Sequence, residues 1–244
     1  MINNKAVDVS ELIHQSKKIT ILSGAGVSTL SGLKDFRSEN GLYSNKVYGL
    51  TPERILSSYF FSTHRHLFYK YYVNHLQTPE TTKPNAIHYA TKQLDIDNKL
   101  VGVVTQNIDG LYQKAGLPNE RLVEIHGNGN EWLCIKCKEK LGFKDIVFNS
   151  KTGNYFSPCH NFLVRPNIVL YDELFKKQDV LRAEEMYQQS DLLIVMGTSL
   201  DIVHHYNSVR NFKHKICLIN NEYVDLKDRA WDAVYLGDIQ DVFH

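Results

Sequence analysis

A glycine-rich segment near the start of the chain has the composition of a phosphate-binding loop. Gly24-Ala25-Gly26-Val27-Ser28 directly follows a short apolar run at residues 19–22. Glycines at the end of a buried strand let the main chain approach a ligand closely, and the N–H groups of a following helix can bind a phosphate. The same glycines could equally serve only to turn a strand into a helix, so the motif alone leaves both interpretations open.

Amide and carboxylate side chains follow a second apolar run, at residues 100–104. Gln106, Asn107 and Asp109 stand there. Asn and Asp can bind a carboxamide and a ribose hydroxyl through paired donors and acceptors. These residue types are also common in ordinary turns, so a purely structural role stays open.

The cysteines indicate metal or redox chemistry. Of four cysteines, Cys134 and Cys137 form a C-x-x-C pair, Cys159 follows with His160 beside it, and Cys217 lies in an apolar run. The first 18 residues have no apolar core and no small-residue cleavage site, which argues against a secretory signal. Because disulfides are rare in a reducing compartment, we expect a cytoplasmic protein with thiol chemistry rather than structural disulfides.

Four continuous apolar runs predict the strands that position these groups. They lie at residues 19–22, 100–104, 192–196 and 215–219. Continuous rather than alternating runs are typical of parallel strands covered on both faces, and helical stretches separate them. In open α/β sheets, ligands bind at the carboxyl ends of the strands. We therefore expect one site that gathers Gly24, Gln106, Gly197 and Asn220.

Two segments interrupt the alternation of strands and helices. Residues 36–76 contain helical patterns at 52–58 and 60–76, the second rich in aromatic residues. Residues 128–164 contain the C-x-x-C pair and a Gly/Asn/Ser-rich stretch. The remaining helical stretches lie at residues 11–18, 84–95 and 177–190. The sequence thus predicts an α/β domain with two insertions.

Composition excludes several classes of protein. Lys and Arg number 28 against 27 Asp and Glu, a formal net charge of +1, which argues against a nucleic-acid or polybasic membrane binder. Hydrophobic content of 43% with 23% charged residues is ordinary for a globular protein. No apolar run approaches the roughly 20 residues of a membrane span. We expect no nucleic acid and no membrane as partners, and a monomer, because no coiled-coil heptad is present.

A longer set of motifs identifies a family. The glycine-rich segment continues to give the pattern GAGVS-x-x-SG-x-x-DFRS over residues 24–38. Further blocks follow in order: Thr105-Gln106-Asn107-Ile108-Asp109-Gly110-Leu111, Glu124-Ile125-His126-Gly127, Arg165-Pro166-Asn167-Ile168-Val169-Leu170-Tyr171, Gly197-Thr198-Ser199-Leu200 and Ile219-Asn220. Together they span about residues 19 to 238. The chain resembles the sirtuins, the NAD-dependent protein deacylases.

The resemblance implies a fold and a reaction. The fold would be a Rossmann-like parallel-sheet domain with a smaller inserted domain, which combines a helical module and a zinc-ribbon-like module. In the reaction, the bond between nicotinamide and ribose in NAD breaks as the acyl oxygen of an acylated lysine attacks the ribose, and a histidine acts as general base. The products would be nicotinamide, deacylated lysine and O-acyl-ADP-ribose. The expected division is a large domain of residues 1–35, 77–127 and 165–244, and a small domain of residues 36–76 and 128–164.

The resemblance also assigns residues. His126 matches the base, and an ordinary pKa near 6.5 suits proton abstraction near neutral pH. Asn107 and Asp109 complete the expected catalytic set, and Val169 and Tyr171 would contact the acylated protein or peptide substrate. The expected NAD-binding residues are Gly24, Ala25, Gly26, Asp35, Phe36, Arg37, Gln106, Asn107, Ile108, Asp109, Gly197, Thr198, Ser199, Asn220 and Ile239.

The zinc module departs from the family pattern of two C-x-x-C pairs. The first pair is intact, but the positions of the second fall on Ser157 and His160. Three thiolates with His160 would make a Cys₃His zinc site. Adjacent ligands would be strained in extended backbone, where neighbouring side chains diverge. We expect zinc at Cys134, Cys137, Cys159 and His160, with a metal-free module packed around Trp132, Phe143 and Tyr155 as the alternative.

Other departures concern the acyl substrate. Asp172 replaces a family glycine before Glu173, where its side chain could hinder a peptide strand or favour basic peptides. His204 and His205 stand where relatives have proline and small residues, and a metal there is not expected. No Tyr-x-x-Arg pair typical of succinyl- or malonyl-preferring members is present, which favours acetyl and other uncharged groups, although Arg65 keeps an acidic acyl group open.

A rival function keeps the NAD pocket without peptide docking. It would make the chain an NAD glycohydrolase or ADP-ribosyltransferase, and Asp172 with the irregular zinc module motivates it. The intact His126 argues against a catalytically silent NAD-binding module.

Overall fold

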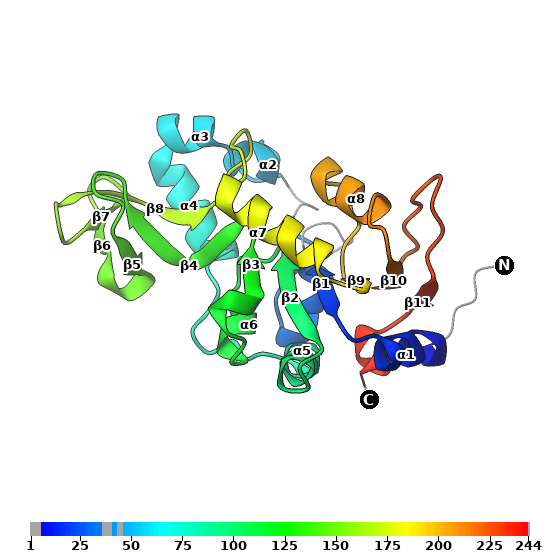
Figure 1. The fold of residues 1–244 in the computed structure, drawn as a ribbon. Coiled ribbons are helices and arrows are strands. Elements are labelled where there is room, and N and C mark those ends of the chain that lie inside the picture. The colour runs from blue at the N-terminus through cyan, green and yellow to red at the C-terminus, as the bar shows by residue number, and fades with distance from the viewer. Residues whose placement is uncertain (1–5, 36–40, 43–45, 244) are drawn as a thin grey trace.

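The computed structural model of the chain describes residues 6–35, 41–42 and 46–243 (Figure 1). A parallel sheet of six strands forms its centre, in the order β11-β10-β9-β1-β2-β3. The strands are β1 (Ile19–Ser23), β2 (Leu100–Thr105), β3 (Leu122–Glu124), β9 (Leu192–Met196), β10 (Lys215–Asn220) and β11 (Ala233–Leu236). The four predicted strands are β1, β2, β9 and β10, so the prediction of a parallel α/β sheet is confirmed.

The burial of these strands explains their continuous apolar character. All residues of β1 and β9 are buried, because helices cover both faces of the sheet. On one face, α1 (Ala6–Gln15), α5 (Ala86–Ile96) and the short 3₁₀ helix η5 (Ile239–Val242) contribute to one apolar cluster. On the other face, α7 (Lys177–Gln188) and α8 (Val203–Arg210) contribute to a second. The core therefore consists of two layers on either side of one sheet.

The strand order places a crevice at the centre of the sheet. From β1 the chain proceeds outward to β2 and β3, and then returns to β9 on the other side of β1. Ligands in open α/β sheets bind where the strand order reverses in this way. Gly24 follows β1 and Gly197 follows β9, so both segments lie at this reversal.

A second, antiparallel sheet lies at the opposite end of the molecule from α1 and β11 (Figure 1). Its order is β5-β4-β8-β7-β6. The strands are β4 (Gly127–Cys134), β5 (Lys140–Gly142), β6 (Val147–Asn149), β7 (Asn154–Ser157) and β8 (Phe162–Ile168). The expected boundaries at 127/128 and 164/165 fall at the start of β4 and inside β8, so two continuous strands carry the chain out of the parallel sheet and back.

The helical segment packs on this second sheet. It contains α2 (Pro52–Ile55), α3 (Ser58–Thr63) and α4 (Arg65–His75), and a 3₁₀ turn, η4 (Phe143–Asp145), lies beside the sheet. The ring of Trp132 is fully buried, with the rings of Tyr69, Tyr72, Phe143 and Tyr155 within 6.1 Å of it. Aromatic side chains bury large apolar areas, so this cluster supplies the core that unites the two inserted segments.

Two local features anchor the loop after β1. Asn85 caps the start of α5 and its Nδ2 donates to the Val27 carbonyl at 2.8 Å and to Ser31 Oγ at 3.0 Å. The loop itself forms two 3₁₀ turns, η1 (Ala25–Val27) and η2 (Thr29–Ser31).

Within the described part of the chain, no helix is both long enough and apolar enough to cross a membrane.

Candidate active site and metal centre

A cleft of about 630 Å³ opens at the carboxyl ends of the central strands. This volume lies within the range of small-molecule and cofactor sites. Its walls come from the loops after β1, β2, β9 and β10, and from the segment after β8. Predicted site residues that line it are Gly24, Ala25, Gly26, Asp35, Gln106, Asn107, Ile108, His126, Val169, Tyr171, Gly197, Thr198, Ser199 and Asn220.

The glycines of the first loop are required by its packing on the loop after β9. A Cβ atom on Gly24 would lie 2.6 Å from the Gly197 oxygen, and one on Gly26 would lie 2.8 Å from the Gly197 Cα. The segment is followed directly by 3₁₀ turns rather than by an α-helix. The N–H groups of Gly26, Val27 and Ser28 donate to the carbonyls of Gly197, Gly24 and Ala25, because the loop closes into 3₁₀ turns.

Ser28 joins two predicted catalytic residues into one buried network. Its Oγ donates to Asp109 Oδ2 at 2.7 Å and accepts from Asn107 Nδ2 at 3.0 Å. Asn107 Nδ2 also donates to the Gly24 carbonyl at 3.1 Å, and the Leu111 N–H donates to Asp109 Oδ1 at 2.9 Å. Burial raises the pKa of Asp109, while the Leu111 and Ser28 hydrogen bonds oppose that rise. The network fixes the loop after β2 against the loop after β1.

His126 is held in one tautomer. Its Nδ1 lies 2.9 Å from the main-chain oxygen of Gln106. Because a carbonyl can only accept, Nδ1 carries the hydrogen and the neutral ring keeps a lone pair on Nε2. Burial lowers the pKa of His126 to about 4, with the Gln106 hydrogen bond acting in the opposite direction. The imidazole is therefore neutral at physiological pH and equipped to accept a proton.

A group of aromatic rings packs behind His126. Phe175 stacks on the His126 ring with centroids 5.5 Å apart and planes 20° from parallel. His205, from α8, lies 5.7 Å from the His126 ring and 5.8 Å from Phe175. The His205 ring is buried, which lowers its pKa to about 3, and its Nε2 has no hydrogen-bond partner among the described residues. Phe175 and His205 thus cover part of the His126 ring with uncharged aromatic surface, while the ring also lines the cleft.

Polar side chains connect the loops at the other end of the cleft. Gln106 Nε2 donates to Thr198 Oγ1 at 3.0 Å. Asn220 Nδ2 donates to the Thr198 carbonyl at 3.3 Å and to the Glu222 carbonyl at 2.9 Å. The ends of β2, β9 and β10 are therefore tied together through Thr198.

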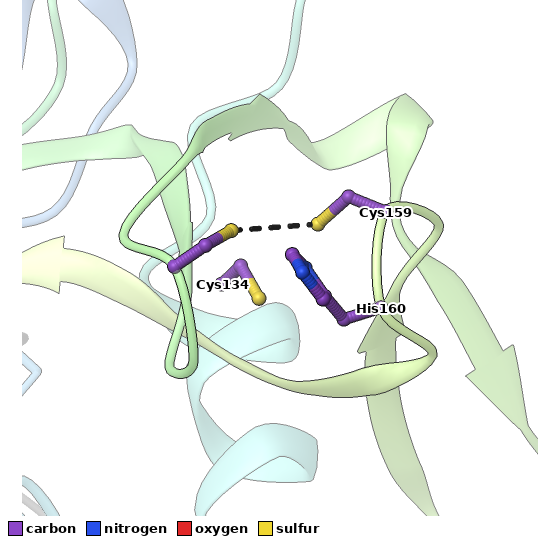
Figure 2. Close-up of side chains that lie close together, drawn as sticks. Cys134, Cys159 and His160 are labelled. Carbon is purple, nitrogen blue, oxygen red and sulfur yellow. Dashed lines mark hydrogen bonds between the residues drawn. The ribbon is translucent and has the colours of Figure 1, made fainter.

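The metal-ligand candidates converge at the far end of the antiparallel sheet. The ligand atoms of Cys134, Cys137, Cys159 and His160 all lie within 4.8 Å of one another (Figure 2). The Sγ atoms of Cys137 and Cys159 are 3.7 Å apart, close to the roughly 3.8 Å between sulfurs of a tetrahedral zinc site with bonds of about 2.3 Å. All four cysteines of the chain are free thiols. The donor set and its spacing fit zinc.

The expected strain between adjacent ligands is absent because the backbone there is not extended. Cys159 and His160 lie in a turn between β7 and β8, and Asn161 after them adopts a left-handed φ of 47°. Ser157, at a position expected for a ligand in the family, is buried and donates to Cys134 Sγ at 3.2 Å. It thus contacts Cys134, one of the candidate ligands, through this hydrogen bond.

The model of the Sir2 family matches residues 24–204. The chain belongs to the Sir2 family. Sir2 relatives named NAD-dependent protein deacetylase include one from Clostridium acetobutylicum, 35% identical over 237 residues, which are 97% of this chain and 95% of the relative. Another, from Staphylococcus epidermidis, is 34% identical over 235 residues, covering 96% and 93% of the two chains.

Solved Sir2 structures share the fold. One, described as Sir2 with a p53 peptide and NAD⁺, has a TM-score of 0.82 and 28% identity, and the match covers 98% of this chain and 95% of that chain. A second, Sir2 bound to acetylated peptide, has a TM-score of 0.82 and 26% identity with the same coverage. The sirtuin-like architecture expected from the motifs is thereby confirmed.

Some predicted Sir2 site residues lie elsewhere. Asp109 is buried beneath the cleft rather than among its lining residues, and Ile239 lies in the apolar cluster with α1 and α5. Phe36 and Arg37 fall outside the described residues. Phe175 and His205 could not be assigned to the site from the sequence, because no motif marks their packing on His126. Ser28 was part of the motif, and its position there could have suggested a role.

The other Sir2 departures also have structural explanations. Tyr112, in α6 (Leu111–Lys114), replaces a histidine common in the family after the Asn107-Ile108-Asp109-Gly110-Leu111 block. It is buried, with its ring 4.8 Å from that of His88. His204 and His205 pack edge-to-face with centroids 5.6 Å apart, and they belong to no metal-binding group among the described residues.

Proposed function

We propose that this Sir2 protein is an NAD-dependent protein-lysine deacetylase. The observation that carries the proposal is the neutral His126 ring at the cleft, with Nδ1 fixed by the Gln106 carbonyl and Nε2 left as a proton acceptor. The names of its relatives and the fold it shares with Sir2 bound to acetylated peptide support the same reaction.

The described cleft residues fit NAD in their chemistry. When bound, NAD supplies an electrophilic ribose carbon whose bond to nicotinamide is broken. The strand-end residues Thr198, Ser199 and Asn220 would bind the phosphates and the adenosine ribose. Asn107 and Ile108 would bind the nicotinamide half, with Asp109 fixing that loop from below through Ser28. Gly24 and Gly26 shape the floor of the cleft by packing on Gly197.

His126 provides the acid–base function. Burial keeps the ring unprotonated near neutral pH, and the Gln106 hydrogen bond, which itself raises the pKa, orients the ring. The ring accepts a ribose hydroxyl proton on Nε2. Phe175 and His205 pack against the ring and hold it in place.

The acylated peptide would contact the segment after β8. Val169 and Tyr171 line the cleft, and 42% of Tyr171 is exposed. Arg65 lies over the Phe61 ring, 5.9 Å from its centroid, and is not a cleft residue. This placement leaves no evident cation for an acidic acyl chain among the described cleft residues, so we propose acetyl and other uncharged acyl groups as substrates.

The remaining assignments complete the proposal. Zinc would be held by three thiolates and His160 as a structural ion that stabilises the second sheet. The large domain would comprise residues 1–35, 77–127 and 165–244, and residues 36–76 and 128–164 would form the small domain. We expect the protein to be a monomer. We also expect it in the cytoplasm, because free thiols suit a reducing compartment.

One assay separates the deacetylase from its rival. The protein is incubated with NAD, with and without an acetyl-lysine peptide, and nicotinamide and deacetylated peptide are measured together. A deacetylase releases the two in equal amounts and only when the peptide is present. Nicotinamide released at the same rate without peptide, and no deacetylated product, would establish the glycohydrolase or ADP-ribosyltransferase instead.

A further inference from the structure

Asp172 occupies a backbone conformation that favours glycine. Its φ is 71°, in the left-handed region that few residues with a side chain adopt. Asp and Asn tolerate this region best, because a short polar side chain can form a local hydrogen bond there. Here the compensating contact is with another element: Asp172 Oδ1 accepts the Ser58 N–H at the start of α3, at 3.0 Å.

This contact fixes the carboxylate but leaves its charge intact. The Ser58 N–H holds the pKa of Asp172 below its ordinary value, so the group is ionised at neutral pH. An N–H donor is neutral and cannot cancel the charge. The neighbouring Glu173 differs, because Arg165 binds both its oxygens, at 2.7 and 2.8 Å. Among the described residues, no cation forms an ion pair with Asp172.

The carboxylate lies where an incoming peptide would meet it. Asp172 lines the cleft directly after Tyr171. Both main-chain groups of Tyr171 are already engaged, since its N–H donates to the Leu56 carbonyl at 2.9 Å and its carbonyl accepts the Ser58 N–H at 3.2 Å. The main chain of Tyr171 is therefore already bonded to the helical segment, and the Asp172 carboxylate lies next to it at the cleft.

The described lining of the cleft does not offset the charge of Asp172. It includes no lysine or arginine, and Arg165, which lies beside this segment, is already paired with Glu173. An acylated lysine is itself neutral, so it gains nothing from the charge of Asp172. A favourable charge on the peptide has to come from residues that flank the acylated lysine.

We infer that Asp172 makes the enzyme prefer acylated peptides with a lysine or arginine beside the target lysine. The inference rests on the proposed deacetylase function and names the substrate class of the same cleft. Exposed ion pairs are weak and screened by salt, so we expect a preference of about threefold to fivefold at low ionic strength.

The test uses three acetyl-lysine peptides that differ only in whether arginine, glutamine or glutamate flanks the target. Deacetylation kcat/KM and peptide Kd by fluorescence anisotropy are measured for each, at low and high salt. Asp172→Asn removes the charge but keeps a side-chain oxygen for Ser58 and tolerates the left-handed backbone. Asp172→Gly removes the side chain and suits that backbone. Glu184→Gln, an exposed acid of α7 outside the cleft, is the matched control.

The expected order in the wild-type enzyme is arginine, then glutamine, then glutamate, with the differences reduced at high salt. Both Asp172 variants should lose the order, and Glu184→Gln should keep it. Equal Kd and kcat/KM for the three peptides, or an order unchanged in Asp172→Asn and Asp172→Gly, would overturn the inference. Charge-dependent binding without any deacetylation would support the role of Asp172 and overturn the proposed reaction, so the two failures are distinguishable.

Discussion

The Nδ1 atom of His126 lies 2.9 Å from the main-chain oxygen of Gln106, which joins the proposed base to the strand-end loop that would bind the ribose. One hydrogen bond therefore sets both the tautomer of the ring and its direction. Gln106 Nε2 also donates to Thr198 Oγ1 at 3.0 Å, so the same residue connects the base to the loop after β9. The proton acceptor and the nucleotide-binding loops share one scaffold.

Replacing His126 should separate catalysis from NAD binding. We expect His126→Ala to lower kcat for deacetylation by about 10²–10⁴-fold, the usual contribution of a general base. The Kd for NAD should change little, because the ring moves a proton and does not hold the dinucleotide. Steady-state deacetylation and calorimetric NAD binding measure the two effects. Activity within tenfold of wild type would remove His126 from the mechanism.

The depressed pKa of His126 predicts activity at mildly acidic pH. A base works in its unprotonated form, and lowering its pKa increases that fraction at any given pH. With a folded pKa of about 4 rather than an ordinary 6.5, kcat/KM should stay flat from pH 8 to below pH 6 and fall only on approach to pH 4. A pH profile in buffers of constant ionic strength checks this. An acidic limb centred near 6.5 would show that burial does not control the base.

The network around Ser28 predicts defects in NAD use. Asn107→Ala leaves Ser28 Oγ and the Gly24 carbonyl without a buried donor. Asp109→Asn replaces one of the two carboxylate oxygens that accept from Ser28 and Leu111 with an NH₂ group, which cannot accept. An unpaired buried polar group costs about 1–3 kcal/mol, so KM for NAD should rise about tenfold in each variant. Asp97→Asn, an exposed substitution at the end of α5, serves as the control. Wild-type NAD kinetics in both network variants would refute the pocket assignment.

Sequence reasoning succeeded where local pattern determines structure. The apolar runs of β1, β2, β9 and β10 are largely buried. Continuous apolar runs of this length are typical of parallel strands covered on both faces. The convergence of Gly24, Gln106, Gly197 and Asn220 followed from parallel topology alone. The motifs supplied His126 and Asn107, whose chemistry a lone residue type would not reveal.

Tertiary packing set the limits of that reasoning. The proximity of Phe175 and His205 to His126 depends on how α8 and the segment after β8 fold onto the ring, and no spacing in the sequence encodes it. The N–H groups of Gly26, Val27 and Ser28 bond to main-chain carbonyls because the loop tightens into 3₁₀ turns rather than an α-helix. The turn that brings Cys159 and His160 together is likewise not predictable from their adjacency, because adjacent side chains diverge in extended backbone but can point the same way in a turn.

The metal centre predicts about one zinc per chain. Structural zinc sites couple binding to folding, so chelation should lower the melting temperature and disorder the second sheet before the parallel sheet. Elemental analysis and thermal unfolding measure the two effects, and hydrogen exchange locates the loosened region. Cys137→Ser should lose the metal and melt at the same temperature as the chelated protein, because it removes one of the three thiolates.

Two substitutions control for loss of a thiol or a nearby hydroxyl. Cys217→Ala removes a buried thiol of β10 outside the cluster, and Ser157→Ala removes the hydroxyl that bonds Cys134 without removing a ligand. Both should retain zinc at the wild-type level. Protein purified without chelators that contains no zinc and unfolds at the same temperature with or without a chelator would contradict the site. Zinc retained in Cys137→Ser but lost in Ser157→Ala would show instead that the serine belongs to the ligand set and that the Cys₃His assignment is wrong.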